Sequence, residues 1–197
     1  MKQISVLILS LLMLKVAKAQ EVLLGVKGGF NIADLHYSDN TSTNSKVGVH
    51  LGVLAHIRAS EKWAVQPEFM YSLEGANNID GGGVNYRLNY LDVPVLLQYL
   101  IGKGFRLEGG PQIDFLLSAK AKTNNITATT TRFQSTGISF PLGFSFISTN
   151  GWGVDARYAF GMSNINATKN NPTIQSNVFQ FGIFYQVRDY GSRYHHR

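Results

Sequence analysis

The sequence predicts an all-β fold, an eight-stranded antiparallel up-and-down transmembrane β-barrel. Three observations carry this prediction. Apolar and polar residues alternate along most of the chain, short links alternate with long polar links, and a secretory signal precedes the first strand. With 20 glycines and only 15% charged residues, the composition suits strands and turns better than a helical bundle. A chain of 197 residues is long enough for one such domain.

The N-terminal segment has the three parts of a secretory signal peptide. Lys2 supplies a positive charge, residues 4–14 are apolar, and Ala17-Lys18-Ala19 forms a cleavage site. This apolar run is shorter than the roughly 20 residues that a membrane-spanning helix needs. We therefore expect cleavage after Ala19, which divides the chain into a signal peptide, 1–19, and an outer-membrane β-barrel domain, 20–197.

Loss of the signal also changes the charge. The formal net charge falls from +6 to +3, with 15 basic and 12 acidic residues, so the basicity that would suggest nucleic-acid binding is largely a targeting feature. The chain has no cysteine, which excludes disulfides and cysteine-based metal sites. No cofactor or metal site is expected.

The first four predicted strands alternate with period two. In 22–32 and 47–57, Val, Leu, Ile and Phe share one face, and Gly, Lys, His and Asn share most of the other. In 63–73, Trp, Val, Phe, Tyr and Leu oppose Gln and Glu. The fourth strand, 88–100, reads LNYLDVPVLLQYL, with Asp92 on its polar face. Such alternation predicts strands with one apolar face each.

The last four predicted strands repeat the pattern. They are 105–117, 138–146, 152–162 and 179–187, each with Phe, Leu, Ile, Val, Trp or Tyr at every second position over most of its length. Short links join the second strand to the third, the fourth to the fifth and the sixth to the seventh. The other links are long and polar, at 34–45, 74–85, 119–132 and 163–176. Tight turns at one end and long loops at the other are typical of an outer-membrane barrel with both termini in the periplasm.

The apolar face is predicted to face lipid. It is bulky on every strand, whereas glycines collect on the polar face, where a narrow barrel is crowded. Aromatic residues lie near both ends of the strands, as interface girdles do. The girdle at the short turns is predicted to contain Trp63, Tyr99, Phe105, Trp152 and Tyr185, and the other Phe30, Tyr71, Tyr86, Tyr90, Phe160 and Phe179. The alternative is a soluble periplasmic lipocalin-like barrel with the faces inverted.

The chain resembles the outer-membrane β-barrel proteins of Bacteroidota that are described as porin-family or PorT-like. The segments that carry the resemblance are GVKGGFN, VQPEFMYSLEGA, LNYLDVPVLLQYL, LEGGPQIDFLLSA and DARYAFGMSNI, which span most of the barrel domain. The chain departs from the pattern in its tail, RDYGSRYHHR, and in Pro141 within FPLGFSF. The resemblance implies a location in the bacterial outer membrane and a barrel architecture, but no single activity.

Charged residues on the polar face predict a network inside the lumen. Near-equal numbers of positive and negative charges indicate pairing, since an unpaired buried charge is costly, and they favour a plugged lumen over a narrow pore for small solutes. Asp92 is expected to pair with Arg106. The predicted network contains Lys27, Arg58, Lys62, Glu68, Glu74, Asp92, Arg106, Glu108, Asp114, Asp155, Arg157 and Arg188.

No catalysis is expected. His36 lies near Asp34 and Ser38 in the first long loop, an arrangement that could belong to an enzymatic barrel, but polar residues are common in such loops. The expected partners are outer-membrane lipid and the barrel-assembly machinery during insertion, with no nucleic acid. An extracellular or envelope protein partner would bind through the long loops. Pro94 in the fourth strand is expected to cause a local bulge.

Overall fold

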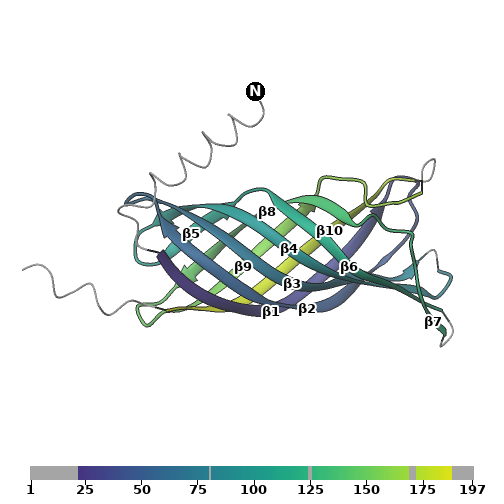
Figure 1. Ribbon diagram of the computed structural model, residues 1–197, viewed down its shortest axis with the longest axis horizontal. Helices are drawn as coiled ribbons and strands as arrows, with labels where there is room; N and C mark the ends of the chain where they lie inside the picture. The colour runs from purple at the N-terminus through teal and green to yellow at the C-terminus, as the bar shows by residue number, and fades with distance from the viewer. Residues whose placement is uncertain (1–21, 80, 124–125, 169–171, 188–197) are drawn as a thin grey trace, which may run out of the picture.

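The computed structural model describes residues 22–79, 81–123, 126–168 and 172–187, which form one closed antiparallel sheet (Figure 1). The predicted signal peptide and Arg188 lie outside the described residues. The strands are β1 Val22–Tyr37, β2 Asn44–Arg58, β3 Trp63–Ile79, β4 Val84–Ile101, β5 Phe105–Gly109, β6 Gln112–Thr123, β7 Ile126–Thr129, β8 Thr136–Ile147, β9 Trp152–Gly161 and β10 Ile174–Gln186.

The sheet closes into a barrel because the first strand pairs with the last. β1 runs antiparallel to both β2 and β10, so neither of its edges is free. β5 and β6 form a single wall between β4 and β8, since Leu97 pairs with Gly109 and Pro94 with Gln112 in one unbroken register. The ring therefore has the eight walls that the sequence predicts, and the β6–β7 hairpin projects beyond it (Figure 1).

The outer surface of the ring is apolar. Large side chains at alternate positions are strongly exposed, including Val47 at 71%, Leu51 at 67% and Met162 at 64%. The intervening positions are buried and largely polar. A barrel with this arrangement suits a lipid environment, and the inverted, soluble lipocalin-like alternative is wrong. No helix within the described ranges is long and apolar enough to cross a membrane.

The strands are longer than the sequence predicts. β1, β2, β3 and β4 have 15 to 18 residues each, whereas a transmembrane strand needs only about 9–11. Much of the predicted loops 34–45, 74–85 and 119–132 is therefore strand, which extends the barrel wall beyond the length that a bilayer needs. These extensions were predicted as loops because they are rich in polar residues, so they lack the alternation of apolar and polar residues by which the other strands were recognised. We call this the loop end of the barrel, and the opposite end, with its short links, the turn end.

The predicted bulge at Pro94 is wrong. β4 keeps one register with β6 from Pro94 to Tyr90, and the shift comes later, between Tyr90 and Asn89. Pro94 is almost fully buried and points into the lumen, as does Pro141 on β8. Because β4 keeps period two, Tyr86 and Tyr90 also point inward, and their predicted place in the outer girdle is wrong.

Candidate functional site

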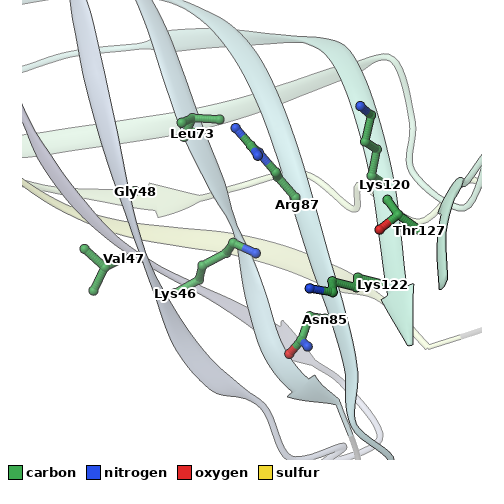
Figure 2. A pocket seen from close by; sticks show the side chains of 9 residues that line it. All are labelled: Lys46, Val47, Gly48, Leu73, Asn85, Arg87, Lys120, Lys122 and Thr127. Atoms are coloured by element: carbon green, nitrogen blue, oxygen red, sulfur yellow. The ribbon is translucent and has the colours of Figure 1, made fainter. Parts of the chain in front are cut away.

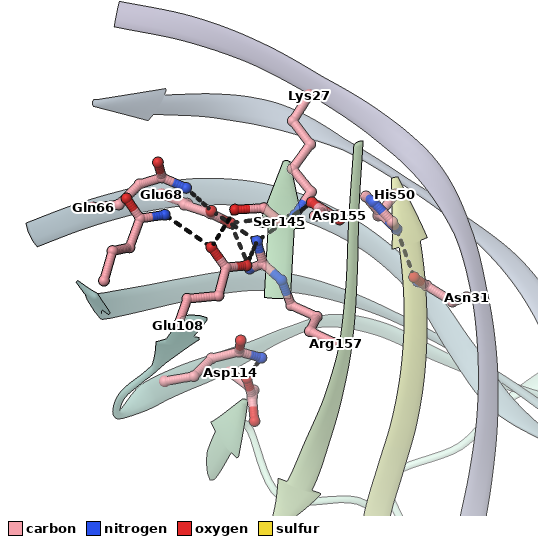
Figure 3. A network of polar contacts seen from close by, with 12 residues as sticks. Lys27, Asn31, His50, Gln66, Glu68, Glu108, Asp114, Ser145, Asp155 and Arg157 are labelled. Atoms are coloured by element: carbon pink, nitrogen blue, oxygen red, sulfur yellow. Dashed lines mark hydrogen bonds and ion pairs between the residues drawn. The ribbon is translucent and has the colours of Figure 1, made fainter. Parts of the chain in front are cut away.

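The lumen contains a compact network of buried ions (Figure 3). Arg157 of β9 is at its centre, and its Nη1 lies 2.9 Å from Glu68 Oε2. Its Nη2 lies 3.1 Å from Glu108 Oε1 and 3.5 Å from Asp155 Oδ2. Lys27 of β1 forms an ion pair with Asp155 and lies 4.0 Å from Glu68. These five side chains come from four strands, β1, β3, β5 and β9, and are almost completely buried, so they join opposite walls of the barrel across the lumen. We call them the ion-paired plug.

Neutral amides and a hydroxyl complete the plug, and the sequence prediction omitted them. Gln66 donates to Glu68 at 2.8 Å, and Gln98 donates to Glu108 at 2.8 Å. Ser145 also donates to Glu108, at 3.2 Å. The two bonds to Glu108 occupy Oε2, the oxygen that Arg157 leaves free, whereas Gln66 adds a second donor to Glu68 Oε1, which also accepts from Arg157 Nη2 at 3.0 Å. Such additional hydrogen bonds are the condition for a buried ion pair to be tolerated. Gln66, Gln98 and Ser145 occupy polar-face positions in the period-two pattern, and this pattern could have predicted that they point into the lumen.

Arg106 belongs to a second group at the turn end. It contacts His56 Nδ1 at 3.4 Å and donates to Gln186 Oε1 at 3.1 Å, and His56 is bonded to Gln98 at 2.8 Å. The predicted pairing of Arg106 with Asp92 is wrong. Asp92 lies opposite Asp114, whereas Arg106 lies opposite Leu100, eight residues further along β4.

Glu74, Asp92 and Asp114 form a separate acidic group nearer the loop end. Ser72 and Ser176 donate to Glu74, and Gln112 and Ser139 donate to Asp114. Asp92 is 1% exposed, and neither of its carboxylate oxygens has a hydrogen-bond partner among the described residues. No described cation forms an ion pair with any of the three. We call them the acidic trio.

The charge balance of the lumen therefore differs from the prediction. Arg58 and Lys62 are exposed at the short turn between β2 and β3, so their assignment to the network is wrong. At a strand end, alternation no longer determines whether a side chain reaches the lumen or solvent. The described lumen has three cations, Lys27, Arg106 and Arg157, and six carboxylates. The excess of negative charge is the acidic trio.

Glycines opposite the plug make room for its side chains. Gly52 pairs with Lys27, Gly182 with Asp155, and Gly143 with both Arg157 and Glu108. A Cβ atom on Gly143 would lie 2.6 Å from both Cα and Cβ of Arg157. A Cβ on Gly182 would meet Asp155 Oδ1 at 2.9 Å, whereas at Gly52 the nearest atom is the backbone oxygen of Phe69, so either a charged side chain or a neighbouring strand occupies the space.

We expect Gly143→Ala to lower the free energy of unfolding by about 1–3 kcal/mol, because it overpacks the wall beside Arg157. Gly28→Ala is the matched control, since a Cβ on Gly28 would meet its nearest neighbour at an ordinary 3.4 Å. Urea unfolding of refolded protein in lipid vesicles measures both changes. Equal effects of the two substitutions would contradict the packing argument.

An apolar cluster fills the lumen at the loop end. Tyr86, Leu88 and Tyr90 of β4 pack there with Phe133 and Ile165 from the segments that follow β7 and β9. These two segments are joined by the hydrogen bond from Gln134 N to Ile165 O at 2.7 Å, together with a bridge between Phe133 and Asn166. The predicted loops thus include residues that fold over the barrel end and cover it. We call this cluster the apolar cap.

The girdle residues at the turn end lie in edge-to-face or tilted aromatic pairs on neighbouring strands. Trp63 and Tyr99 have ring centroids 4.9 Å apart, and Trp152 and Tyr185 5.1 Å. Phe105 packs on Phe146 at 4.9 Å. Trp63, Phe105 and Trp152 are exposed on the outer surface, and Tyr99 and Tyr185 are half-buried beside their partners. Amphipathic rings at this level suit the boundary between lipid and water.

Neither a nucleophilic triad nor a metal cluster is assembled in the described chain. Asp34 accepts a hydrogen bond from Thr43, and Ser38 accepts one from the backbone N–H of Thr173, so both bond away from His36. Among the described residues, no group of three His, Asp or Glu side chains could hold a metal ion. His50 and His56 lie in the lumen, bonded to Asn31 and Gln98.

A closed barrel with an apolar exterior and a polar interior defines an integral membrane β-barrel. The chain belongs to the outer membrane protein beta-barrel domain family, whose model matches residues 18–167. No curated protein matches the sequence. The chain is therefore an integral β-barrel protein of the bacterial outer membrane.

Solved structures of outer-membrane proteins share this fold. Neisserial surface protein A has a TM-score of 0.57 and 11% identity, and the match covers 86% of this chain and 100% of that one. Ail, the attachment invasion locus protein of Yersinia pestis, has a TM-score of 0.55 and 14% identity, with 85% and 99% covered. At these identities the likeness establishes the fold alone.

Proposed function

We propose that this protein is a non-conducting, non-catalytic barrel that serves as a structural or surface-interaction element of the outer membrane. The observation that carries the proposal is the filling of the lumen by the ion-paired plug and the apolar cap. Side chains from opposite walls meet in the plug, and Phe133 and Ile165 cover the loop end. A pore for small solutes would need a continuous polar path, and both features oppose one.

The partners we propose follow from this role. Outer-membrane lipid contacts the apolar exterior, and the barrel-assembly machinery inserts the chain. A protein partner from the envelope or the exterior would meet the loop end, where the β6–β7 hairpin projects beyond the ring. We propose that the chain comes from a member of the Bacteroidota, in keeping with its PorT-like segments.

Planar-bilayer recordings test whether the lumen is closed. Refolded protein is expected to give no stable unitary current steps, because the ion-paired plug and the apolar cap interrupt the lumen. A known porin added to the same bilayer provides the positive control. Reproducible unitary steps from this protein alone would contradict the proposal and favour the narrow-pore alternative.

Fractionation of the expressing cell tests the export step. We expect the protein in the outer-membrane fraction, with gel mobility that shifts on heating, and with a mature N-terminus at Gln20 after loss of residues 1–19. Edman sequencing of the purified protein identifies that residue. Another first residue would contradict cleavage after Ala19 without affecting the closed lumen.

A further inference from the structure

A basic pocket lies near the loop end of the barrel, over β2, β4 and β6 (Figure 2). Its volume is 510 Å³, and four of its lining residues are the cations Lys46, Arg87, Lys120 and Lys122, with no acidic residue among them. Gly48 also lines the pocket, and the backbone of Leu73 on β3 packs directly against it, since a Cβ on Gly48 would overlap Leu73 O.

Strand pairing brings the four cations together. Arg87 of β4 lies directly opposite Lys120 of β6, and Asn85 lies opposite Lys122. Lys46 of β2 reaches across β3, and its Nζ donates to the backbone oxygen of Tyr86 at 2.9 Å. Tyr86 and Leu88 point into the lumen, so Arg87 between them points outward, where it is exposed like Lys120 and Lys122.

The charge of this pocket is uncompensated within the described chain. None of the four cations forms an ion pair with a described residue. Like charges directly opposite one another on neighbouring strands are destabilising, as Arg87 and Lys120 are here. In the ion-paired plug, by contrast, each cation lies within 4.0 Å of at least two carboxylates. A bound anion would relieve the repulsion in the pocket.

The pocket adjoins the lipid-facing surface. Val47 follows Lys46 directly, and Leu117 precedes Lys120 by three residues; both are strongly exposed on the outer face. On β4, Leu91 lies four residues below Arg87. At about 3.3 Å per residue, these cations lie within roughly 3–13 Å of lipid-facing side chains. An anion held here is therefore at the level of lipid headgroups.

We propose that the basic pocket binds the phosphate group of a lipid of the outer leaflet, whose acyl chains lie against Val47 and the apolar surface below it. Arg87 and Lys120 supply the paired cations for the phosphate, and Lys46 and Lys122 flank them. The assignment rests on the placement of the barrel in the outer membrane with its loop end outward. It is independent of whether the lumen conducts.

The probe is lipid A that carries its phosphates, mixed into micelles of neutral detergent with the refolded chain, and native mass spectrometry measures the retained lipid. The test variant is R87Q/K120Q, and the control is R58Q/K62Q, which removes the same charge from the exposed turn at the other end. We expect the test variant to lose affinity by about 30-fold, since each cation near an anionic lipid is worth a factor of roughly five. The control should keep wild-type affinity.

Two further arms distinguish the source of the phosphate. Dephosphorylated lipid A should bind wild type as weakly as phosphorylated lipid A binds R87Q/K120Q, and inorganic phosphate in the millimolar range should not displace the lipid. Equal retention of both lipids, or equal loss in both variants, would overturn the proposal. Displacement by inorganic phosphate would overturn the lipid assignment in favour of a free-phosphate site.

Stability without lipid A shows whether the test variant is folded. R87Q/K120Q removes a repulsive pair, so its unfolding midpoint in neutral detergent should equal or exceed that of wild type. Addition of lipid A should then raise the wild-type midpoint more than that of the variant, because ligand binding stabilises the folded state. An equal rise in both proteins would contradict the pocket.

Discussion

Replacement of Arg157 by Met is expected to lower the free energy of unfolding by about 3–5 kcal/mol, because removal of one partner leaves buried charges uncompensated. Arg157 contacts Glu68, Glu108 and Asp155. Without it, Lys27 is the one cation left among the five residues of the plug. Urea unfolding in lipid vesicles, followed by tryptophan fluorescence and heat-dependent gel mobility, measures the change.

Arg58→Met is the matched control for this experiment. The sequence pattern assigns Arg58 and Arg157 to the same network, whereas the structure exposes Arg58 at a turn. The control should change the free energy of unfolding by less than about 0.5 kcal/mol. A double substitution adds a second test, since Glu68→Gln should make the loss of Arg157 less costly by removing one stranded carboxylate. Equal costs for Arg58→Met and Arg157→Met would contradict the plug.

The same chemical change at two lumen carboxylates is expected to have opposite effects. Asp155→Asn should lower the free energy of unfolding by about 3 kcal/mol, because it removes the nearer of the two carboxylates that pair with Lys27 and one that pairs with Arg157. Asp92→Asn should raise it by about 1–2 kcal/mol, because the acidic trio has no cation and Asp92 is buried without a hydrogen-bond partner in the described structure.

Both substitutions replace a carboxylate by an amide of nearly the same size and remove one negative charge. A difference between their effects on the free energy of unfolding therefore reports on the surroundings of each carboxylate. Both are measured in the same vesicles at neutral pH, with wild type as the reference. Asn at position 92 can also donate a hydrogen bond, which the ionised carboxylate cannot. A loss of stability in Asp92→Asn comparable to that of Asp155→Asn would mean that the trio is paired and that the division of the lumen is wrong.

The lumen thus has three layers with different physical roles. The ion-paired plug and the Arg106 group fill the half toward the turn end, the acidic trio lies between, and the apolar cap closes the loop end. Among the six described lumen carboxylates, the three of the trio are the ones that form no ion pair with a described cation. Stability is expected to reside in the cap and in the plug, where Arg157→Met and Asp155→Asn lower it.

Much of the fold could be predicted from residue types alone. The period of two placed Leu51 and Val53 on one face and His50 and Gly52 on the other, and the structure confirms this division. The alternation fails at strand ends, where Arg58 extends into solvent. It also fails near the loop end, where Tyr86 and Tyr90 keep the strand register while the lumen becomes apolar. Local patterns contain no information about the height at which a lumen changes from polar to apolar.

The sequence by itself determined the class of the protein. The alternation of apolar and polar residues, the bulky apolar face and the glycines on the polar face together predict a lipid-facing barrel. Each of these features can be recognised within one strand, because it depends only on neighbouring residues along the chain. The tertiary structure alone decided which charges meet. Arg157 and Glu68 form their ion pair although they are 89 residues apart in the sequence. Asp92 lies opposite Asp114 on the neighbouring strand and not beside Arg106, as the sequence predicted. Ring closure and register across eight walls set those partners, since both depend on pairings between strands that no single segment specifies.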